Sequence, residues 1–364
     1  MIILQLIQKP QRRGAELFAV QLSNHLQKLG HTVVLIALFK GANELPFSGK
    51  IITLDRPQKY RWFDWYGYKE ISVLIQQYNP DIIQCNAGDT LKYAVVSKFL
   101  FRWNTPIIAR NASTVSQYIK NAIVKKINGW LYKKTSAIIS VSQHSKEDLI
   151  KLFPKVAFKT KVIPIGIEPI LLKDVHWQED SNASTHIVHV GGFTFEKNHK
   201  GLLRIFKDFL EFKPESHLHL LGDGPKKAAI QELSKSLGIL DKITFYGYVP
   251  NPVDYIKKAD MLVLPSLIEG LPGVILEAMY AKTPVIAYDV GGIGEVVTDA
   301  TGFLVAKNDA AGFVIAMTAS LSCGPESSLC DAAYELVTGH YNNKKIGRDF
   351  EGVYGGLLSG KDTK

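Results

Sequence analysis

The sequence predicts an α/β protein of two doubly wound domains, each built on a parallel sheet. Short β-branched runs alternate with segments of helical period along the chain, which is the pattern of repeated βαβ units. The alternation stops once, over residues 169–184, where polar residues, Pro and Trp gather, and then restarts. A length of 364 residues also suits two hydrophobic cores of ordinary size. We therefore expect Rossmann-like domains at 1–168 and 185–342, a linker at 169–184 and a C-terminal helical segment at 343–364.

The composition indicates a soluble globular enzyme. Apolar residues make up 46% and charged residues 21% of the chain, which excludes a disordered or fibrous protein. No apolar run approaches the roughly 20 residues of a bilayer-spanning helix, and the stretch Met1–Ile7 is too short for the core of a signal peptide. Cys85, Cys323 and Cys330 have no metal-ligand spacing and leave one cysteine over, as suits a reducing compartment. These observations predict a cytoplasmic protein.

The net charge of +9 is concentrated in one half of the chain. Residues 1–168 carry 24 Lys+Arg against 10 Asp+Glu, whereas the remainder carries 19 against 24. A basic half should be drawn to a phospholipid surface, a diphosphate-bearing substrate or nucleic acid. No helix-turn-helix, RNP-type or zinc motif accompanies the charge, so nucleic acid is not expected as a partner. A basic surface that serves only solubility explains the charge equally well.

Strands and helices are predicted in alternation on both sides of the linker. In the first half the strands are Ile2–Ile7, Thr32–Leu38, Asp81–Cys85, Pro106–Ala109 and Ala137–Val141, and the helices include Ala15–Leu29 and Gln143–Phe153. In the second half the strands are His186–Val190, His217–Leu221, Lys242–Tyr246, Met261–Leu264 and Pro284–Ala287, and helices start near Lys200, Lys226 and Gly273. A last helix, Asn343–Leu358, could fold back onto the first domain. Ligands of such sheets bind beyond the carboxyl ends of the strands, so two facing domains place a substrate in the cleft between them.

The strongest motif runs from Pro265 to Met279, directly after an apolar strand. Gly270, Pro272 and Gly273 prevent a helix before about residue 273, so Glu269 lies in a loop and Glu277 lies about one turn into a helix. The unpaired N–H groups of that helix start suit a diphosphate. The two carboxylates would accept hydrogen bonds from hydroxyls on either side of it. Two surface glutamates at a helix start are the plainer explanation.

Three further loops also follow predicted strands. Gly191 and Gly192 let the backbone approach a ligand, and Lys197, in the same loop, can supply a positive charge to a leaving diphosphate. Gly222 and Gly224 form a second glycine-containing loop. In the first half, Gly14 stands at the mouth of a helix and would let that domain's backbone close on the same phosphates. Each loop alone is equally compatible with an ordinary strand-to-helix turn.

In combination and in this order, these motifs resemble the retaining GT-B glycosyltransferases that share an E-x7-E element. The resemblance covers nearly the whole chain, from Gly14-Ala15-Glu16 and Gly30-His31, through Ile163–Ile167, Val190-Gly191, Glu196-Lys197, Leu221–Pro225 and Gly247–Val249, to Glu269…Glu277, Pro284–Ala287 and Gly291-Gly292. It implies the GT-B fold, a UDP-sugar or GDP-sugar donor, and no metal or other cofactor. No Asp-x-Asp site argues for a metal.

The resemblance also implies roles for single residues. Glu277 would bind the ribose hydroxyls, Glu269 the donor sugar, and Lys197 would neutralise the departing diphosphate as the second catalytic residue. Val249 would flank the base. The backbone amides next to the phosphates would be those of Gly270, Leu271, Gly273 and Val274, on either side of Pro272.

The chain departs from the family pattern in two places. Gly192 stands where an Arg often helps Lys197 to hold the phosphates, which weakens the expected clamp unless Lys200 or Arg13 replaces it. A His often follows a strand on the acceptor side, but here Arg110 and Asn111 occupy that place and are assigned to the acceptor. The acceptor itself is expected to be a saccharide or a lipid-linked saccharide, as in the building of a surface polysaccharide. A nucleotide-sugar epimerase and a catalytically silent nucleotide-sugar-binding protein are the alternatives.

The basic half contains one amphipathic stretch, Tyr118–Lys134. Ile119, Ile123, Ile127, Trp130 and Leu131 are predicted to share one helical face that is surrounded by five lysines. Such a helix could lie on an anionic membrane, at the inner face of the plasma membrane. The alternative is that the apolar stripe packs against the domain's own sheet.

Overall fold

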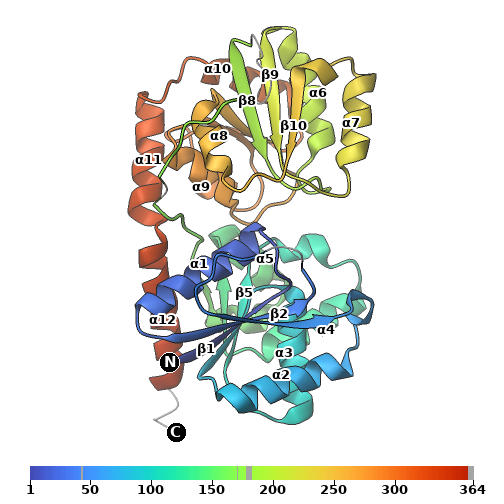
Figure 1. Ribbon diagram of the computed structural model, residues 1–364, viewed down its shortest axis with the longest axis vertical. Helices are drawn as coiled ribbons and strands as arrows, with labels where there is room; N and C mark the ends of the chain where they lie inside the picture. The colour runs from blue at the N-terminus through green and yellow to red at the C-terminus, as the bar shows by residue number, and fades with distance from the viewer. Residues whose placement is uncertain (42–43, 170, 178–182, 360–364) are drawn as a thin grey trace. The chain divides into compact units, whose positions relative to one another are not determined.

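The computed structural model describes residues 1–41, 44–169, 171–177 and 183–359. Contacts divide the chain into two compact units: unit 1 is Met1–Glu168 together with the C-terminal segment from Asn342, and unit 2 is Pro169–Tyr341. Each unit is a parallel sheet with helices packed on it (Figure 1). Among the helices that the structure describes, none combines the length and the apolar character needed to cross a membrane.

Unit 1 contains a seven-stranded sheet in the order β3-β2-β1-β4-β5-β6-β7, and every neighbouring pair is parallel. Its strands are β1 (Ile2–Ile7), β2 (Thr32–Phe39), β3 (Lys50–Arg56), β4 (Ile82–Cys85), β5 (Ile107–Asn111), β6 (Ala137–Ser140) and β7 (Thr160–Val162). Its helices are α1 (Gly14–Lys28), α2 (Trp65–Tyr78), α3 (Gly88–Phe101), α4 (Ala122–Lys133), α5 (Gln143–Leu152) and α12 (Asn343–Ser359). Short 3₁₀ helices are η1 (Gln58–Tyr60), η2 (Val115–Tyr118) and η3 (Pro154–Lys159).

Alternate residues of the central strands face two separate hydrophobic layers. Leu4 and Leu6 of β1 pack with the helices α2 to α5, whereas Ile3 packs with α1 and α12. Because both faces are covered, these strands are apolar at nearly every position, as expected for a parallel sheet. This explains why the central strands were recognisable as continuous apolar runs.

Helix α12 completes the second layer of unit 1. Its Phe350 ring lies 5.8 Å from the Phe18 ring of α1, and both rings are buried. The hydroxyl of buried Tyr354 donates a hydrogen bond to Gln84 of β4, and Glu351 pairs with His31 at 2.8 Å. The last helix therefore belongs to the core of unit 1, although it follows unit 2 in the sequence.

Unit 2 contains a six-stranded parallel sheet in the order β10-β9-β8-β11-β12-β13. Its strands are β8 (Thr185–Val190), β9 (Ser216–Leu221), β10 (Ile243–Gly247), β11 (Met261–Leu264), β12 (Val285–Tyr288) and β13 (Phe303–Val305). Its helices are α6 (His199–Leu210), α7 (Lys227–Ser236), α8 (Pro252–Lys258), α9 (Gly273–Tyr280), α10 (Ala310–Ser320) and α11 (Ser328–His340), with the 3₁₀ helices η4 (Leu240–Lys242) and η5 (Ile293–Glu295). The sheet of unit 2 thus has the Rossmann order 3-2-1-4-5-6, and that of unit 1 has the same order with β7 added at one edge, so the prediction of two doubly wound domains is confirmed.

The predicted linker lies partly outside the described residues, and its described part packs on unit 2. The backbone N–H of Lys173 donates to Asp254 at 2.8 Å, and the Trp177 ring stacks on His219 with ring centroids 3.8 Å apart. The loss of periodicity therefore marks a segment that has no helix or strand in its described part (169, 171–177 and 183–184) but that still makes contacts.

The start of α4 differs from the prediction. The helix begins at Ala122, where the Asn121 side chain accepts a hydrogen bond from the backbone N–H of Val124, so Ile119 and Lys120 precede the helix. An Asn at this position satisfies one of the free N–H groups of the first turn. The apolar stripe therefore starts at Ile123 and not at Ile119.

The packing of α12 is testable through Phe350. Replacing it by Ala (Phe350→Ala) should lower the free energy of unfolding by about 3–5 kcal/mol, because the change leaves a cavity between α12 and α1 that the surrounding side chains cannot fill. Urea unfolding of the full chain measures the loss. The matched control is Phe158→Ala, since that ring is 88% exposed and should be nearly neutral. Equal midpoints for the two variants would contradict the assignment of α12 to the core.

Candidate active site

The predicted donor-binding loops of unit 2 all follow strands at the carboxyl end of its sheet. The strand order reverses between β8 and β11, and this switch point is where doubly wound sheets bind ligands. The loop after β8 and the loop after β11 are joined there. The N–H of Leu267 donates to the carbonyl of Glu196 at 2.7 Å, and the Asn198 side chain donates to the carbonyl of Pro265 at 3.0 Å. Lys197 and Glu269 are thereby held on adjoining loops.

The glycine loops are fastened to one another by their backbones. The N–H of Gly191 donates to Leu221 at 2.9 Å, and that of Gly222 donates to Gly247 at 2.7 Å. Gly222 has φ +140°, and a Cβ there would lie 2.1 Å from the carbonyl oxygen of Gly191. At Gly224 a Cβ would lie 2.7 Å from the backbone nitrogen of Phe193. These glycines are therefore required by the close approach of one loop to the next.

Gly192 is different, because the surrounding atoms leave room for a side chain. A Cβ at this position would meet the carbonyl oxygen of Asp223 at 3.4 Å and the Thr194 methyl group at 3.8 Å, which are ordinary contacts. Its φ lies outside the range that only glycine adopts freely. The fold therefore does not require glycine at the position where the sequence departs from the family pattern.

Lys197 and Glu269 form an ion pair. The Lys197 Nζ lies 2.6 Å from Glu269 Oε1, and the two side chains are 21% and 11% exposed. The ammonium has three N–H groups, so it can donate to a ligand while it stays paired with Glu269. The structure thus brings together the two residues predicted to be catalytic.

Helix α9 begins at Gly273, as the sequence predicts, with Pro272 as its N-cap residue and no side-chain cap. The first N–H groups of a helix have no intrahelical acceptor and attract anions. Glu277 lies in the second turn and is half-buried. Burial raises the pKa of its carboxyl to about 7, and among the described residues no ion pair or side-chain hydrogen bond is formed with it. The ionised carboxylate of Glu277 can therefore accept hydrogen bonds from a ligand.

The remaining predicted donor residues surround this helix start. Gly270, Leu271 and Pro272 are buried, while Val274 and, after β10, Val249 are half-buried. Residues 291 and 292 hold this loop: the N–H of Gly292 donates to the carbonyl of Gly270. Gly291 has φ +61°, and a Cβ there would lie 2.1 Å from the Glu269 carbonyl oxygen, so both its backbone conformation and its contact require glycine.

Two buried histidines that the sequence did not single out lie beneath the Lys197 loop. His189 Nδ1 donates to the carbonyl of Val263 at 2.8 Å, and the His199 ring stacks on Phe193 with centroids 4.0 Å apart. Burial lowers the pKa of His189 to about 4 and that of His199 to about 2, and the positive charge of Lys197 contributes in both cases. Both rings are neutral at physiological pH, so the charge of Lys197 has no cationic histidine beside it. The sequence features that could have pointed to them are the place of His189 within an apolar strand and of His199 at the start of a helix.

In unit 1, Gly14 is the first residue of α1, and no other atom lies within 4 Å of a Cβ placed on it. Arg110 is buried at the end of β5, with its guanidinium 4.2 Å from the centre of the Phe18 ring, and burial lowers its pKa to about 10. Asn111 donates from Nδ2 to Ser140 Oγ at 3.2 Å and to the Ser145 carbonyl at 2.9 Å. Arg110 and Asn111 are adjacent, but they engage different parts of unit 1.

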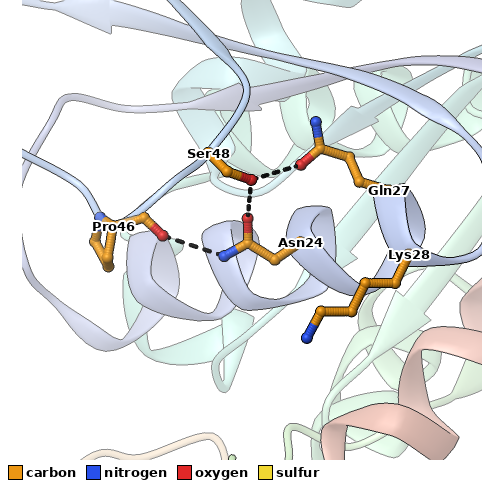
Figure 2. A pocket seen from close by; sticks show the side chains of 5 residues that line it. All are labelled: Asn24, Gln27, Lys28, Pro46 and Ser48. Atoms are coloured by element: carbon orange, nitrogen blue, oxygen red, sulfur yellow. Dashed lines mark hydrogen bonds between the residues drawn. The ribbon is translucent and has the colours of Figure 1, made fainter.

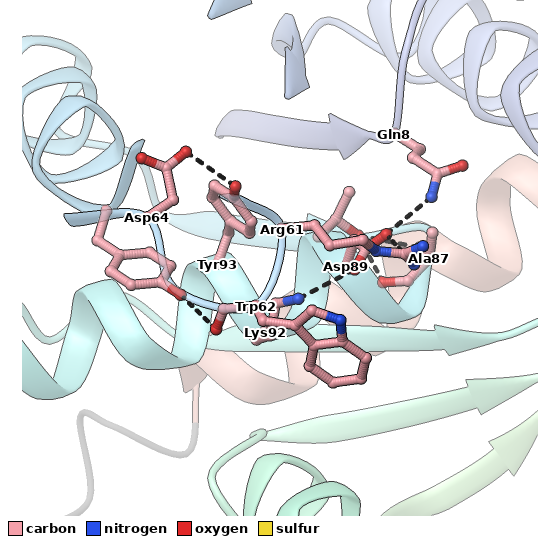
Figure 3. Close-up of polar contacts among 10 residues, drawn as sticks. Gln8, Arg61, Trp62, Asp64, Ala87, Asp89, Lys92 and Tyr93 are labelled. Atoms are coloured by element: carbon pink, nitrogen blue, oxygen red, sulfur yellow. Dashed lines mark hydrogen bonds and ion pairs between the residues drawn. The ribbon is translucent and has the colours of Figure 1, made fainter. Parts of the chain in front are cut away.

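A second polar cluster, not predicted from the sequence, lies at the switch point of unit 1. Asp89, at the start of α3, accepts hydrogen bonds from Gln8 Nε2 at 2.8 Å, from Arg61 Nη2 at 2.8 Å and from Lys92 Nζ at 3.1 Å (Figure 3). Gln8 directly follows β1, and the Lys92 ammonium also lies 5.0 Å from the centre of the Trp62 ring. These side chains come from three separate segments, so spacing along the sequence could not reveal the cluster.

One surface pocket lies on unit 1 and is distinct from both groups of residues. It is lined by residues of α1 and of the segment before β3: Asn24, Gln27, Lys28, Pro46 and Ser48 (Figure 2). Asn24 Nδ2 donates to the Pro46 carbonyl at 3.1 Å, and the Ser48 hydroxyl donates to Asn24 and Gln27. These contacts fasten the segment before β3 to α1. Within the described ranges, no group of three His, Cys, Asp or Glu residues is arranged to hold a metal ion.

Two family models match the chain, one in each unit. Residues 12–170 match the model described as Glycosyltransferase Family 4, and residues 175–333 match the model described as Glycosyl transferases group 1. The second match contains every residue of the site built around Lys197, Glu269 and Glu277.

Named relatives and solved structures agree with these models. An uncharacterized glycosyltransferase of Methanocaldococcus jannaschii is 27% identical over 236 residues, which cover 60% of this chain and 58% of that protein. The amylovoran biosynthesis glycosyltransferase AmsD of Erwinia amylovora is 24% identical over 297 residues, covering 80% and 82%. The chain spans little more than half the length of the first relative. Among solved structures, Anabaena HepE in complex with UDP and glucose has a TM-score of 0.81 at 18% identity, covering 98% of this chain and 100% of that one.

The raised pKa of Glu277 predicts how stability depends on pH. Because the folded pKa is about 7 and the ordinary value is 4.5, ionisation is disfavoured only in the folded state. The penalty is absent below the ordinary value and complete above the folded one. Glu277→Gln should therefore gain stability over the wild type as pH rises from about 5 to about 8, by on the order of 1–2 kcal/mol for a half-buried group.

Unfolding curves at several pH values measure this gain. Glu335→Gln, at an exposed position of α11, is the matched control and should follow the wild type at every pH. A constant difference between Glu277→Gln and the wild type across the range would show that the Glu277 pKa is not raised.

Proposed function

Because the chain belongs to the group 1 glycosyltransferases, we propose that it transfers a sugar from a UDP- or GDP-linked donor to a saccharide or lipid-linked saccharide, with retention of configuration. The observation that carries the proposal is the Lys197–Glu269 ion pair beside the start of α9. A cation, a carboxylate and free helix N–H groups lie at the switch point of one sheet. This combination suits a sugar diphosphate better than either a sugar or a phosphate alone.

The donor fits this arrangement in one direction. The diphosphate would lie at the first N–H groups of α9, where the helix dipole favours negative charge, and within reach of Lys197. Glu277, further along the same helix and without a donor of its own, would accept hydrogen bonds from the ribose hydroxyls. Glu269 would accept from hydroxyls of the sugar, and Val249 would border the base.

The chemistry follows from the same placement. The bond between the anomeric carbon and the diphosphate oxygen breaks, the electron pair leaves with the diphosphate, and the acceptor hydroxyl attacks from the face that the diphosphate leaves. The hydroxyl proton passes to the departing phosphate. Glu269 is already paired with Lys197, which argues against its acting as a covalent nucleophile. Stabilising the developing charge on the diphosphate, by Lys197 and by α9, would supply much of the rate. Neutralisation by these groups is why we propose that no metal is needed.

The named relatives support the choice of substrates. AmsD is named for amylovoran biosynthesis, and HepE binds UDP and glucose. A UDP-sugar donor and a growing polysaccharide as acceptor are therefore the substrates that we propose for this chain.

Thermal unfolding across a panel of nucleoside diphosphates and nucleotide sugars tests the donor. Stabilisation should be largest for one nucleoside diphosphate and its sugars, because only the folded state binds them. An epimerase would convert the donor to a second sugar without any acceptor, and a silent binding protein would be stabilised but release no diphosphate. Slow hydrolysis of an unchanged donor sugar supports the transferase and contradicts both alternatives.

Lys197 and Glu277 should affect different kinetic constants. Lys197→Met should lower kcat roughly 100- to 1,000-fold, because it removes a charge that is needed most in the transition state. Glu277→Gln should mainly raise KM for the donor, because the ribose is held equally before and during the reaction.

The matched control for Lys197→Met is Lys207→Met, at an exposed position of α6. The double variant Lys197→Met/Glu269→Gln excludes an effect that comes only from leaving the Glu269 charge unpaired. An unchanged kcat in Lys197→Met would remove Lys197 from the mechanism.

Gly192→Arg should strengthen binding of the diphosphate by roughly fivefold to tenfold, because a guanidinium there would add charge-assisted hydrogen bonds where the backbone leaves room. Isothermal titration with the preferred nucleoside diphosphate measures the gain, and Gly192→Ala is the control for the backbone change. If Arg and Ala at this position bind equally, the side chain at residue 192 does not face the diphosphate.

A further inference from the structure

The outer surface of α2, α3 and α4 carries a strip of large apolar side chains that other described residues leave open. The rings of Trp65 and Phe101 are 5.6 Å apart and link α2 to α3, and those of Phe99 and Trp130 are 6.0 Å apart and link α3 to α4. Phe99 is 64% and Trp65 is 47% exposed. Groups of this size are normally buried, so a connected set of them marks a surface that binds something.

On α4 the strip continues along the face that was predicted from the sequence to be apolar. Leu131 is buried against the core of unit 1, and Trp130 is half-buried. One and two turns earlier, Ile127 is 41% and Ile123 is 70% exposed. The end of the stripe therefore packs against unit 1, while its beginning points to solvent.

The segment before α2 adds exposed aromatic residues in a fixed conformation. Trp62 is 68% and Phe63 is 72% exposed. On either side of them in the sequence, Arg61 donates to Asp89 at 2.8 Å, and buried Asp64 accepts two hydrogen bonds from Arg56 at 2.9 Å (Figure 3 shows Arg61, Trp62, Asp64 and Asp89). The polar side chains of the segment thus hold it to unit 1, which leaves the aromatic rings outside.

From residue 90 of α3 to the end of α4 the charge beside the strip is of one sign, whereas α2 carries the partly exposed Glu70, which pairs with Arg56. Residues 90–146 contain no Asp or Glu. They contain ten basic residues: Lys92, Lys98, Arg102, Arg110, Lys120, Lys125, Lys126, Lys133, Lys134 and Lys146. Of these, the four lysines of α4 and its end are exposed. Whatever covers the strip is therefore selected for negative charge.

We propose that this surface, the aromatic–basic face formed by residues 60–66, Phe99–Phe101 and α4, binds the headgroup region of an anionic lipid bilayer. A second copy of the chain is disfavoured because it would bring the same positive charge to the contact. Nucleic acid would satisfy the lysines but would not cover Ile123 and Ile127. A bilayer surface does both, since it accepts shallow insertion of Trp, Phe and Ile while its phosphates attract lysine. The inference rests on the proposed function in one respect: a lipid-linked acceptor would be presented at such a surface.

Sedimentation with lipid vesicles tests the inference on the full chain. The protein should sediment with vesicles that contain phosphatidylglycerol, much less with vesicles of pure phosphatidylcholine, and less again as salt is added. Protein that remains in the supernatant with the anionic vesicles would overturn the proposal. So would a concentration-dependent dimer in solution that is lost in Ile123→Ser, because the face would then be occupied by a second copy.

Two pairs of variants assign the binding to this face. Ile123→Ser/Ile127→Ser should reduce vesicle binding, whereas Ile315→Ser, at a position on α10 that is also 70% exposed, should not. Lys125→Gln/Lys126→Gln should weaken binding to the anionic vesicles by roughly tenfold or more, whereas Lys207→Gln/Lys213→Gln, exposed on unit 2, should not. Equal effects within either pair would overturn the assignment.

The same samples keep this test apart from that of the proposed function. Every variant should still be stabilised by the preferred nucleoside diphosphate, because none of these residues belongs to unit 2's site. Vesicle binding without stabilisation by any nucleotide would refute the proposed activity but support the membrane-binding surface. Stabilisation by a nucleotide without vesicle binding would refute the membrane-binding surface but support the proposed activity.

Discussion

Gly291 runs so close to the loop after β11 that a Cβ there would lie 2.1 Å from the carbonyl oxygen of Glu269. On the other side, the N–H of Leu267 is bound to Glu196, next to Lys197. The backbone of the Glu269 loop is thus held between the loop after β12 and the Lys197 loop by backbone contacts alone. Everything proposed for the site depends on this constraint, because a preorganised charge stabilises a transition state only if it does not have to move. The glycines of unit 2 matter chiefly because they allow these loops to approach one another so closely.

The residues assigned to the diphosphate supply little unbalanced positive charge. Lys197 is balanced by Glu269, Gly192 has no side chain, and His189 and His199 are neutral because burial lowers their pKa values. In the proposed binding mode the N–H groups of α9 would then supply much of the attraction, together with any lysine of the neighbouring loops, such as Lys226 beside Phe195. An arrangement of this kind binds the substrate modestly and interacts more strongly with the transition state, in which charge develops on the leaving group. Catalysis requires this difference between the two binding energies.

Much of this site could be predicted from the sequence because its parts are local. A strand, two glycines and a helix start are short patterns, and parallel strands bring their carboxyl ends together wherever they lie in the chain. The central strands were clear for the same physical reason, since both of their faces are buried. Strands β3, β7 and β13 were not predicted. β7 and β13 have only three residues each, and β3 is an edge strand whose residues are mostly half-buried. The Asp89 cluster joins three distant segments and depends on tertiary structure alone.

The positive charge of the first half shows most clearly what a sequence count cannot decide. The count applies equally to Arg110 and Lys125, yet Arg110 is buried over a phenylalanine ring while Lys125 is exposed beside Ile123. Only the second can act at a distance on an anionic partner, because buried charge interacts mainly with its immediate neighbours. The absence of acidic residues from 90 to 146 has the same consequence. Among the described residues, the four exposed lysines of α4 and its end form no ion pair, so they keep their field at the surface, beside side chains that water solvates poorly. A surface of this kind favours a partner that is both anionic and able to accept apolar groups.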